Sequence, residues 1–302
     1  MEAGGQEVVY LVIFVVLQIK LINMNNKTDN KKFISSGHNA CAGCGQLSAV
    51  QSVMRALNKN VIIANATGCL EVTTTPYPQS AWNLPWIHSL FENSSAVASG
   101  ISAASKQQKN KNTKVLVLAG DGGTFDIGLG IISGMWERKD NVLYICFDTE
   151  SYSNTGYQAS GATPYGASTS TSPDGECQNK KNCPAGGNNL QKKDMIKIAL
   201  AHNIPYVAQS TAGYPDDIYN KVKKGLEIKG PGYIQILAPC IPGWGIKSDE
   251  AVYMGKLAVQ SGIYPLLEYE NGQLINQSPL ANNHIELQKE YKLKQKRFKH
   301  LF

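Results

Sequence analysis

The sequence contains no apolar run of the ~20 residues that a membrane-spanning helix needs. The run from Val8 to Gln18 is shorter, and it follows acidic residues rather than the basic segment of a secretory signal peptide. We therefore predict no association with a membrane. A polar stretch beginning at Met24 is typical of a natural start, so residues 1–23 are predicted to be an upstream extension from a mis-called start, with a membrane anchor as the alternative.

The chain also lacks a basic patch with interleaved aromatic residues, and a net charge of +6 is modest for 302 residues. We therefore predict no nucleic-acid partner. The positive excess lies near the C-terminus, in Lys289, Lys292, Lys294, Lys296, Arg297 and Lys299. A solvated helix face is the expected role of this run. No internal repeat or break in composition divides the chain, so one domain over 33–302 is predicted, after a disordered or mis-called extension over 1–32.

Seven cysteines in this length do not form a disulfide scaffold. Without a secretion signal, ligand chemistry is favoured over bridging, and a reducing cytoplasm is the expected location. Cys41 and Cys44 form a CxxC pair, while Cys146 lies in an apolar run and is expected to be a buried thiol. Cys177 and Cys183 share a polar loop. The sequence leaves two interpretations open for them: two cysteines that are close by chance, or a local metal site or redox-active pair.

Apolar runs alternate with helical patterns along most of the chain. The predicted strands are 61–64, 115–119, 142–147, 206–209 and 232–237, and the predicted helices are 46–57, 92–107, 194–202 and 215–228. This alternation predicts an α/β fold with a mostly parallel sheet flanked by helices. Two segments are predicted as loops, 73–88 at the rim of a site and 156–189 as a long functional or disordered connection.

A glycine-rich turn follows the strand at 115–119 and consists of Gly120, Asp121, Gly122 and Gly123. A strand that leads through such a turn into a helix leaves backbone N–H groups free to hold a phosphate. Asp121 would repel a bound diphosphate unless a divalent cation such as Mg²⁺ lay between them. The expected ligand is therefore a diphosphate with its metal. An ordinary tight turn is the alternative explanation of these residues.

The strand at 142–147 ends in a second polar run, which extends from Asp148 to Gly156. If the two strands are parallel neighbours, their carboxyl ends meet where open α/β sheets bind ligands. Thr149 and Asn154 are then expected to face Asp121. A GDG turn followed at this distance by SYSNTG is typical of thiamine diphosphate sites.

Four cysteines fall at loop or strand ends on what is expected to be one edge of the sheet: Cys41, Cys44, Cys69 and Cys240. Four thiolates can hold a 4Fe–4S cluster or a structural Zn²⁺. Structural zinc normally combines two CxxC pairs or adds histidines, so the isolated third and fourth cysteines favour iron–sulfur by a narrow margin. A non-enzymatic zinc-binding α/β protein is the alternative from another class.

Five motifs in order, GHNACAGCG, ATGCLEV, AGDGGTFDIG, DTESYSNTGYQ and APCIPGWG, resemble the β subunits of pyruvate:ferredoxin oxidoreductases (pyruvate synthases) within the 2-oxoacid:ferredoxin oxidoreductase family. The similarity extends from Gly37 to the terminal QKRFKHL. It implies thiamine diphosphate, Mg²⁺ and a 4Fe–4S cluster as cofactors. The implied reaction is the reversible oxidative decarboxylation of pyruvate to acetyl-CoA and CO₂, with electrons passed to ferredoxin.

The resemblance also implies roles for single residues. The implied cluster ligands are Cys41, Cys44, Cys69 and Cys240. The implied Mg²⁺ ligands are Asp121, the Thr149 side chain and the Ser151 carbonyl. Cofactor contacts are implied for Gln46, Cys69, the turn from Gly120 to Gly123, Thr149, Ser151 and Asn154, with Asn154 near the reactive thiazolium carbon. Gln46 departs from the glutamate that some relatives carry at that place.

The resemblance also implies partner subunits, because this chain has the motifs of only one of the two domains that a thiamine enzyme needs. Thiamine enzymes also need a pyrimidine-binding domain, which an α subunit is expected to supply. A γ subunit, a ferredoxin-like δ subunit, ferredoxin, coenzyme A and pyruvate are the other implied partners, and the chain is predicted to be inactive alone. ATPYG, which follows DTESYSNTG, favours pyruvate as the substrate. A 2-oxoisovalerate enzyme and a thiamine decarboxylase that passes no electrons are the alternatives.

Overall fold

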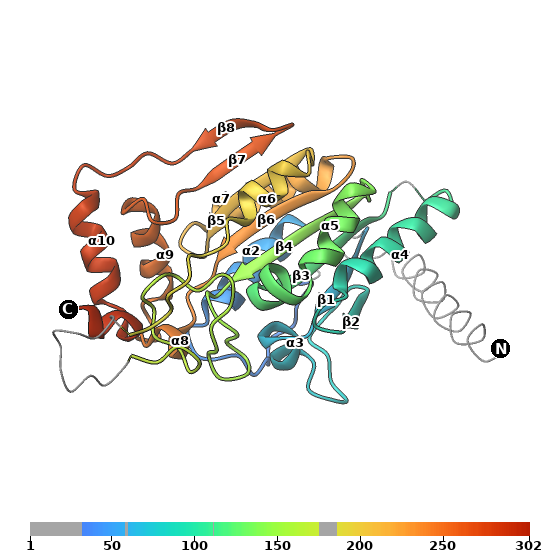
Figure 1. Cartoon of the computed structure of the whole chain (residues 1–302). Helices are drawn as coiled ribbons and strands as arrows, with labels where there is room; N and C mark the ends of the chain where they lie inside the picture. The colour runs from blue at the N-terminus through green and yellow to red at the C-terminus, as the bar shows by residue number, and fades with distance from the viewer. Residues whose placement is uncertain (1–31, 58–59, 111, 175–185) are drawn as a thin grey trace.

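Short segments rich in Val, Ile and Leu form the centre of one sheet in the computed structural model, which describes residues 32–57, 60–110, 112–174 and 186–302 (Figure 1). In this part of the chain the sheet has eight strands. They are β1 (Val61–Ala66), β2 (Trp86–Ser89), β3 (Lys114–Gly120), β4 (Val142–Asp148), β5 (Tyr206–Thr211), β6 (Gly232–Leu237), β7 (Leu267–Glu270) and β8 (Gln273–Gln277).

The strand order is β2-β1-β3-β4-β6-β5-β7-β8. The first six strands of this order are parallel, and β7 and β8 continue the sheet as an antiparallel hairpin. From β1, the chain passes to β2 on one side, whereas β3 pairs with β1 on the other side. Such a reversal of direction opens a crevice at the carboxyl ends of the strands, where α/β folds bind ligands.

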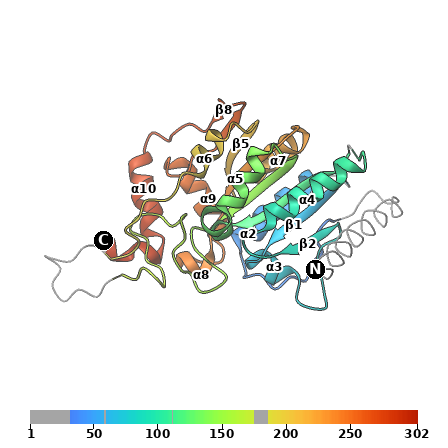
Figure 2. The ribbon, with the colours of Figure 1, turned by 45° about the vertical axis from the view of Figure 1, so that its right-hand side comes forward.

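Helices cover both faces of the sheet, as the two views in Figures 1 and 2 show. One face packs against α2 (Gly45–Ala56) and α7 (Pro215–Glu227), and the side chains between them form one buried core. The other face packs against α4 (Ser94–Gln107), α5 (Leu129–Glu137) and α6 (Met195–Ala201), which enclose a second core. Central strands buried on both faces explain their near-continuous apolar sequences.

The C-terminal region forms a third, smaller core beside the end of β6. Its elements are α8 (Ile241–Trp244), α9 (Ala251–Gln260), α10 (His284–Leu293) and the 3₁₀ helix η2 (Lys296–Leu301). In the run of basic residues at this end, the lysines are exposed but Arg297 is only 5% exposed. The predicted solvated face is therefore correct for the lysines and wrong for Arg297, which packs inside the protein.

Most of the predicted helices and strands are confirmed, but several elements were missed, among them α3 (Cys69–Thr74), β2 and the β7–β8 hairpin. The segment 73–88 is not only a loop, because it contains the end of α3 and most of β2. The turn of the β7–β8 hairpin, Asn271–Gly272, has positive φ at both residues, 47° and 80°, as in the type I′ turns that connect hairpin strands.

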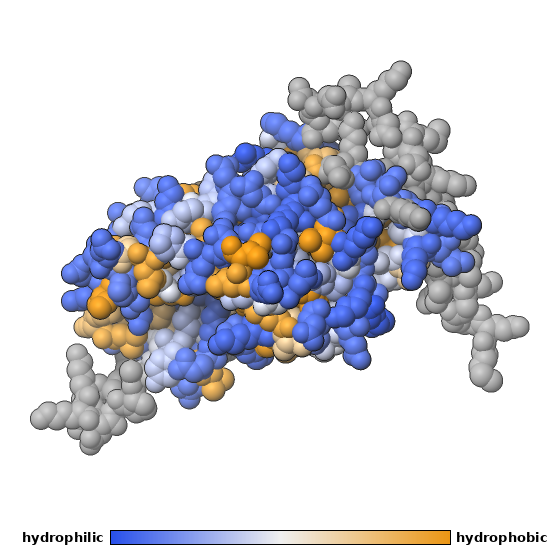
Figure 3. Space-filling view, turned by 90° about the horizontal axis from the view of Figure 1, so that it is seen from above, coloured by the Kyte–Doolittle hydropathy of each residue, from blue (hydrophilic) through white to orange (hydrophobic). Residues whose placement is uncertain are grey.

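The face of the molecule drawn in Figure 3 is mostly hydrophilic, and its hydrophobic residues lie in separate groups. Scattered apolar residues of this kind are normal on protein surfaces. Of the helices in the described ranges, none has the length and apolar character to cross a bilayer. Residues 1–31, which include nearly all of the predicted extension, lie outside the described residues, as do Cys177 and Cys183.

Candidate functional site

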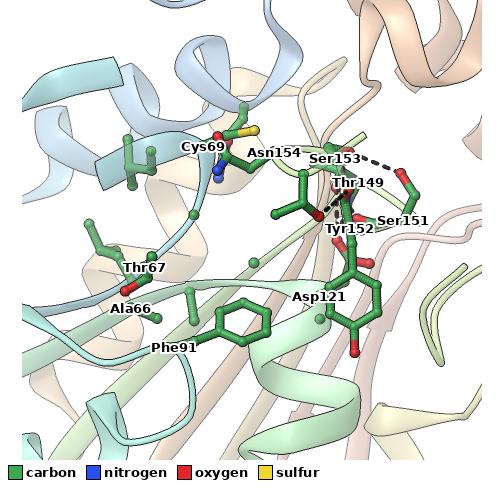
Figure 4. A pocket seen from close by; sticks show the side chains of 18 of the residues that line it. Ala66, Thr67, Cys69, Phe91, Asp121, Thr149, Ser151, Tyr152, Ser153 and Asn154 are labelled. Carbon is green, nitrogen blue, oxygen red and sulfur yellow. Dashed lines mark hydrogen bonds between the residues drawn. The ribbon is translucent and has the colours of Figure 1, made fainter. Parts of the chain in front are cut away.

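A pocket of about 710 Å³, its open mouth included, lies at the carboxyl ends of β1, β3 and β4 (Figure 4). This is the point where the direction of strand addition reverses. Most of the residues predicted to contact a cofactor line it: Gln46, Cys69, Gly120, Asp121, Gly122, Thr149, Ser151 and Asn154. Asn154 is exposed at the pocket wall. Gly123 is buried in the turn behind the wall.

Asp121 and Thr149 meet because β3 and β4 are parallel neighbours, with Gly120 paired to Phe147. The residues that follow the two strands therefore lie side by side. The backbone N–H of Thr149 donates to Asp121 Oδ1 at 3.1 Å, and the Thr149 hydroxyl donates to the same oxygen at 2.8 Å. The predicted contact between the two polar turns is thus present.

Three oxygen atoms form a chain of close contacts at this position. Thr149 Oγ1 lies 2.8 Å from Asp121 Oδ1 and 3.1 Å from the carbonyl oxygen of Ser151. Octahedral Mg²⁺ takes oxygens at 2.0–2.1 Å, which sets neighbouring ligand oxygens about 3 Å apart. The distances from the Thr149 hydroxyl to the Asp121 carboxylate and to the Ser151 carbonyl therefore both fit neighbouring ligands of a magnesium site.

Asp121 carries a charge that this environment does not offset. Its side chain is only 1% exposed. Burial, and then the nearby Asp148 carboxylate, raise the pKa of Asp121 to about 7, although hydrogen bonds from Ser160 and Thr149 act in the opposite direction. Ser160 Oγ donates to Asp121 Oδ2 at 2.6 Å. A cation at the three oxygens would supply the missing positive charge, since a buried carboxylate is costly without a partner.

The glycines of the turn allow close packing behind the pocket. The turn leads into a π-helix, η1 (Gly122–Ile127), a rare form that is frequent at functional sites. An added Cβ would lie 2.4 Å from the Tyr152 ring at Gly122 and 2.9 Å from the Phe91 carbonyl oxygen at Gly123. At Gly120, which lines the pocket, a Cβ would meet nothing within 4 Å, so that side of the backbone is open to a ligand.

Gly128, at the junction of η1 and α5, gives a stability prediction with a built-in control. An added Cβ would lie 2.1 Å from the carbonyl oxygen of Gly123, so Gly128→Ala is expected to lower the free energy of unfolding by about 1–3 kcal/mol. A Cβ at Gly130, two residues on in α5, would meet nothing within 4 Å, so Gly130→Ala should be neutral or stabilising by about 0.5–1 kcal/mol. Urea unfolding measures both, and equal values would contradict the expected crowding.

The four cysteines predicted as cluster ligands come from segments at the same edge of the sheet. They are Cys41, Cys44, Cys69 and Cys240, and each has a free thiol. The CxxC loop is tied to α3 by the N–H of Asn39, which donates to the Thr73 carbonyl at 2.9 Å. A Cβ at Gly45 would lie 2.7 Å from the Pro239 carbonyl oxygen, so the start of α2 packs against the segment that leads to Cys240.

The thiols of this set interact electrostatically. Burial raises the pKa of Cys44, Cys69 and Cys240, that of Cys69 to about 12, and negative charge on other cysteines of the set raises each pKa further. Coulomb interactions weaken with distance, so these effects indicate neighbouring thiols. Among the described residues, however, no three His, Cys, Asp or Glu side chains could hold a single ion. Zinc needs its sulfurs ~2.3 Å from one centre, whereas a 4Fe–4S cluster is larger.

Ser153 connects the two groups of residues. Its hydroxyl donates to Thr149 Oγ1 at 2.9 Å, and Ser153 also lies near enough to Cys240 to lower the pKa of that thiol. Figure 4 shows Ser153 beside Thr149 on the pocket wall, with Cys69 and Asn154 along the same pocket. The oxygens that fit magnesium and the cysteine set therefore lie on either side of one serine.

Four residues of the site were missed from the sequence. Phe91 and Tyr152 line the pocket with ring centroids 5.9 Å apart, and the Tyr152 hydroxyl donates to Asp126 Oδ2 at 2.9 Å. Ser153 belongs to the motif DTESYSNTGYQ, but no role was predicted for it. Ser160 lies in the segment that was predicted to be a long loop. Only the polar, small-residue composition of 151–160 could have indicated that this segment contacts Asp121.

Comparison with known proteins identifies the family. Residues 66–236 match the thiamine pyrophosphate enzyme family in its C-terminal TPP binding domain. The pyruvate synthase subunit PorB of Methanothermobacter thermautotrophicus is 45% identical over 276 residues, which cover 91% of this chain and 92% of that protein. The chain belongs to the PorB family. It is a β-type subunit of a thiamine-dependent 2-oxoacid:ferredoxin oxidoreductase, and such a subunit works in a complex with others.

Two further matches concern the substrate named for a relative and the fold. The ketoisovalerate oxidoreductase subunit VorB of Pyrococcus abyssi is 39% identical over 88% of this chain and 85% of that protein. Among solved structures, the 2-oxoglutarate:ferredoxin oxidoreductase from Magnetococcus marinus has a TM-score of 0.61 at 22% identity, covering 88% of this chain and 91% of that one, which supports the fold alone. The predicted fold class and family are confirmed, and because the family is one of enzyme subunits, the alternative of a non-enzymatic protein is wrong.

Proposed function

We propose that this PorB-family chain binds Mg²⁺–thiamine diphosphate and a 4Fe–4S cluster, and that it acts in the oxidative decarboxylation of pyruvate to acetyl-CoA and CO₂. The observation that carries the proposal is the meeting, at one sheet edge, of an oxygen set that fits magnesium and a set of free cysteines. Ferredoxin is the proposed electron acceptor, and the reaction is proposed to be reversible.

The proposed cofactor site uses residues on both polar turns. Asp121, Thr149 and the Ser151 carbonyl would hold the metal, and the backbone from Gly120 to Gly123 would approach the diphosphate. Thiamine diphosphate supplies an electron sink for decarboxylation. Asn154 and Gln46, which both line the pocket, are proposed to orient the reacting groups. The apolar walls at Phe91 and Tyr152 would exclude water.

The proposed cluster site uses the four cysteines at the neighbouring segments, Cys41, Cys44, Cys69 and Cys240. Thiolates are the usual ligands of such clusters, which accept electrons singly. Because Ser153 contacts both Thr149 and Cys240, the distance from the thiamine site to the cluster would be short. Because the four proposed cluster ligands must be free thiols rather than disulfides, the proposal also favours a reducing, cytoplasmic location.

Anaerobic purification of the native complex, followed by metal, cofactor and subunit analysis, tests this proposal. We expect one thiamine diphosphate and about four or more irons per copy of this chain, together with an α subunit that supplies the pyrimidine-binding domain. The γ and ferredoxin-like δ subunits are expected in the same complex. Stoichiometric zinc in place of iron, or a complex without thiamine diphosphate, would refute the cofactor assignment.

The substrate is the least specified part of the proposal, since both a pyruvate synthase subunit and a ketoisovalerate oxidoreductase subunit are close relatives. We predict that the purified complex prefers pyruvate to 2-oxoisovalerate by about 10-fold or more in kcat/KM, the size of effect that a small hydrophobic pocket achieves. The rates of viologen reduction with the two oxoacids measure this preference. A complex that favours the branched acid would make the 2-oxoisovalerate alternative correct.

A further inference from the structure

The turn that carries two proposed magnesium ligands has a strained centre. Glu150 lies between Thr149 and Ser151 and has φ of +61°, in the left-handed region that glycine usually occupies. For a residue with a Cβ this conformation is disfavoured, because the Cβ crowds the following carbonyl oxygen. The left-handed residue reverses the chain so that Thr149 Oγ1 and the Ser151 carbonyl oxygen lie 3.1 Å apart. Without this conformation the two oxygens would not face one point.

Side-chain and backbone contacts hold Glu150 in this conformation. Its N–H donates to Asp148 Oδ1 at 3.1 Å, and its carbonyl accepts from the Thr163 hydroxyl at 2.8 Å. Its carboxylate is 4% exposed and pairs with Lys192 at 2.9 Å and with Arg297 at 2.5 Å. Lys192 also contacts Asp148 at 2.6 Å. Two carboxylates and two cations thus neutralise each other under the turn.

Arg297 contacts the turn by a second route. Its guanidinium lies 4.1 Å from the centre of the Trp244 ring, and Trp244 Nε1 donates to the carbonyl of Thr149 at 2.9 Å. The backbone carbonyl of Arg297 accepts from Ser168 N at 2.7 Å, so the arginine itself is anchored. One guanidinium from the C-terminal 3₁₀ helix therefore supports Thr149 through a tryptophan and Glu150 directly.

We propose that Arg297 is a positioning residue for the metal-binding turn: with Trp244 and Glu150, it keeps the Thr149 and Ser151 oxygens in the arrangement that binds Mg²⁺. This inference rests on the proposed thiamine site. It gives a function to the C-terminal segment, which lies far from the turn in sequence and contributes nothing to the pocket wall. Arg297 itself touches neither metal nor substrate.

The direction in which Mg²⁺ affinity changes when Arg297 is replaced distinguishes a positioning role from a purely electrostatic one. Removing the positive guanidinium would leave Glu150 and Asp148 to share Lys192, and the extra net negative charge near the metal would by itself strengthen Mg²⁺ binding. Loss of positioning would weaken it, because partners that orient metal ligands typically contribute roughly 10–100-fold to affinity. Positioning therefore predicts weaker binding despite the more favourable charge.

The test is a magnesium titration of thiamine diphosphate binding, followed by tryptophan fluorescence, in the purified complex after chelator treatment. Arg297→Met is expected to raise the half-saturating Mg²⁺ concentration by roughly 10–100-fold, with full binding restored at high Mg²⁺. Arg297→Lys should recover part of the loss, because it keeps the charge without the planar fork. Arg138→Met, which removes an exposed pair with Asp140, is the matched control and should match the wild type.

The outcomes distinguish this inference from the proposed function. If the wild-type complex shows no Mg²⁺-dependent thiamine diphosphate binding, the proposed function fails. If the wild type binds and Arg297→Met binds with equal or lower Mg²⁺ demand, the positioning role is wrong. If Arg297→Met does not fold, Trp244→Phe decides: it keeps the ring but removes the donor to the Thr149 carbonyl, and an unchanged Mg²⁺ demand would then overturn the inference.

Discussion

Replacing Asp121 with asparagine is expected to weaken Mg²⁺-dependent thiamine diphosphate binding by about 100-fold or more and to abolish oxoacid oxidation by the complex. Asp121 is the only carboxylate in the proposed ligand set, and losing a direct ligand should cost at least as much as losing a residue that orients one. Equilibrium binding at fixed Mg²⁺, with activity measured in parallel, tests the expectation. Binding that remains within about threefold of wild type would remove Asp121 from the metal site.

The same substitution should not damage the fold, and this separates a ligand role from a structural one. Burial and then Asp148 raise the pKa of Asp121 from 3.8 to about 7, so ionisation of this carboxyl destabilises the folded chain, fully above pH 7 and progressively less as pH falls from 7 toward 4. The cofactor-free Asp121→Asn chain should therefore be as stable as wild type or more stable at pH 8, and the difference should shrink as pH falls through 7 and the wild-type carboxyl becomes protonated. Asp140→Asn, at an exposed surface pair, should leave both binding and stability unchanged.

The centre of the fold and the meeting of Asp121 with Thr149 followed from local patterns, whereas the Ser151 carbonyl was implied only by the family resemblance. Apolar runs in β3 and β4 predicted two buried strands, and the parallel pairing of neighbours placed Asp121 next to Thr149. Both conclusions depend on residues close to each other in sequence or on a general rule of α/β sheets. For this reason, composition and spacing were sufficient to predict them.

What escaped prediction depends on tertiary contacts. Ser160 reaches Asp121 from a segment without periodicity, and Arg297 is buried only because Glu150 and Trp244 lie opposite it. A charged residue in a lysine-rich run is expected to be solvated, and no local signal distinguishes this arginine. The Asn271–Gly272 hairpin is different, since its turn signal was present in the sequence and was overlooked.

Replacing Cys240 with alanine is expected to lower the iron bound to the cofactor-binding chain from about four atoms to well under one, and to abolish electron transfer while thiamine diphosphate still binds. Clusters of this kind need all four thiolates, so one missing ligand exposes an iron. Burial, and to a smaller extent negative charge on the other cysteines, raises the pKa of Cys69 and Cys240, so the deprotonated set is costly without a bound cation. Iron analysis of this chain separated anaerobically from the complex measures the loss.

Cys146→Ala is the matched control, because Cys146 is fully buried in β4 and takes no part in the cysteine set. Its replacement should leave iron content unchanged and cost about 1 kcal/mol of stability from the lost packing. The comparison also decides between the oxidoreductase and a decarboxylase that passes no electrons. Full oxoacid oxidation in Cys240→Ala would show that the cysteine set is dispensable for the reaction, whereas loss of oxidation with retained cofactor binding assigns electron transfer to the segment that joins β6 to α8.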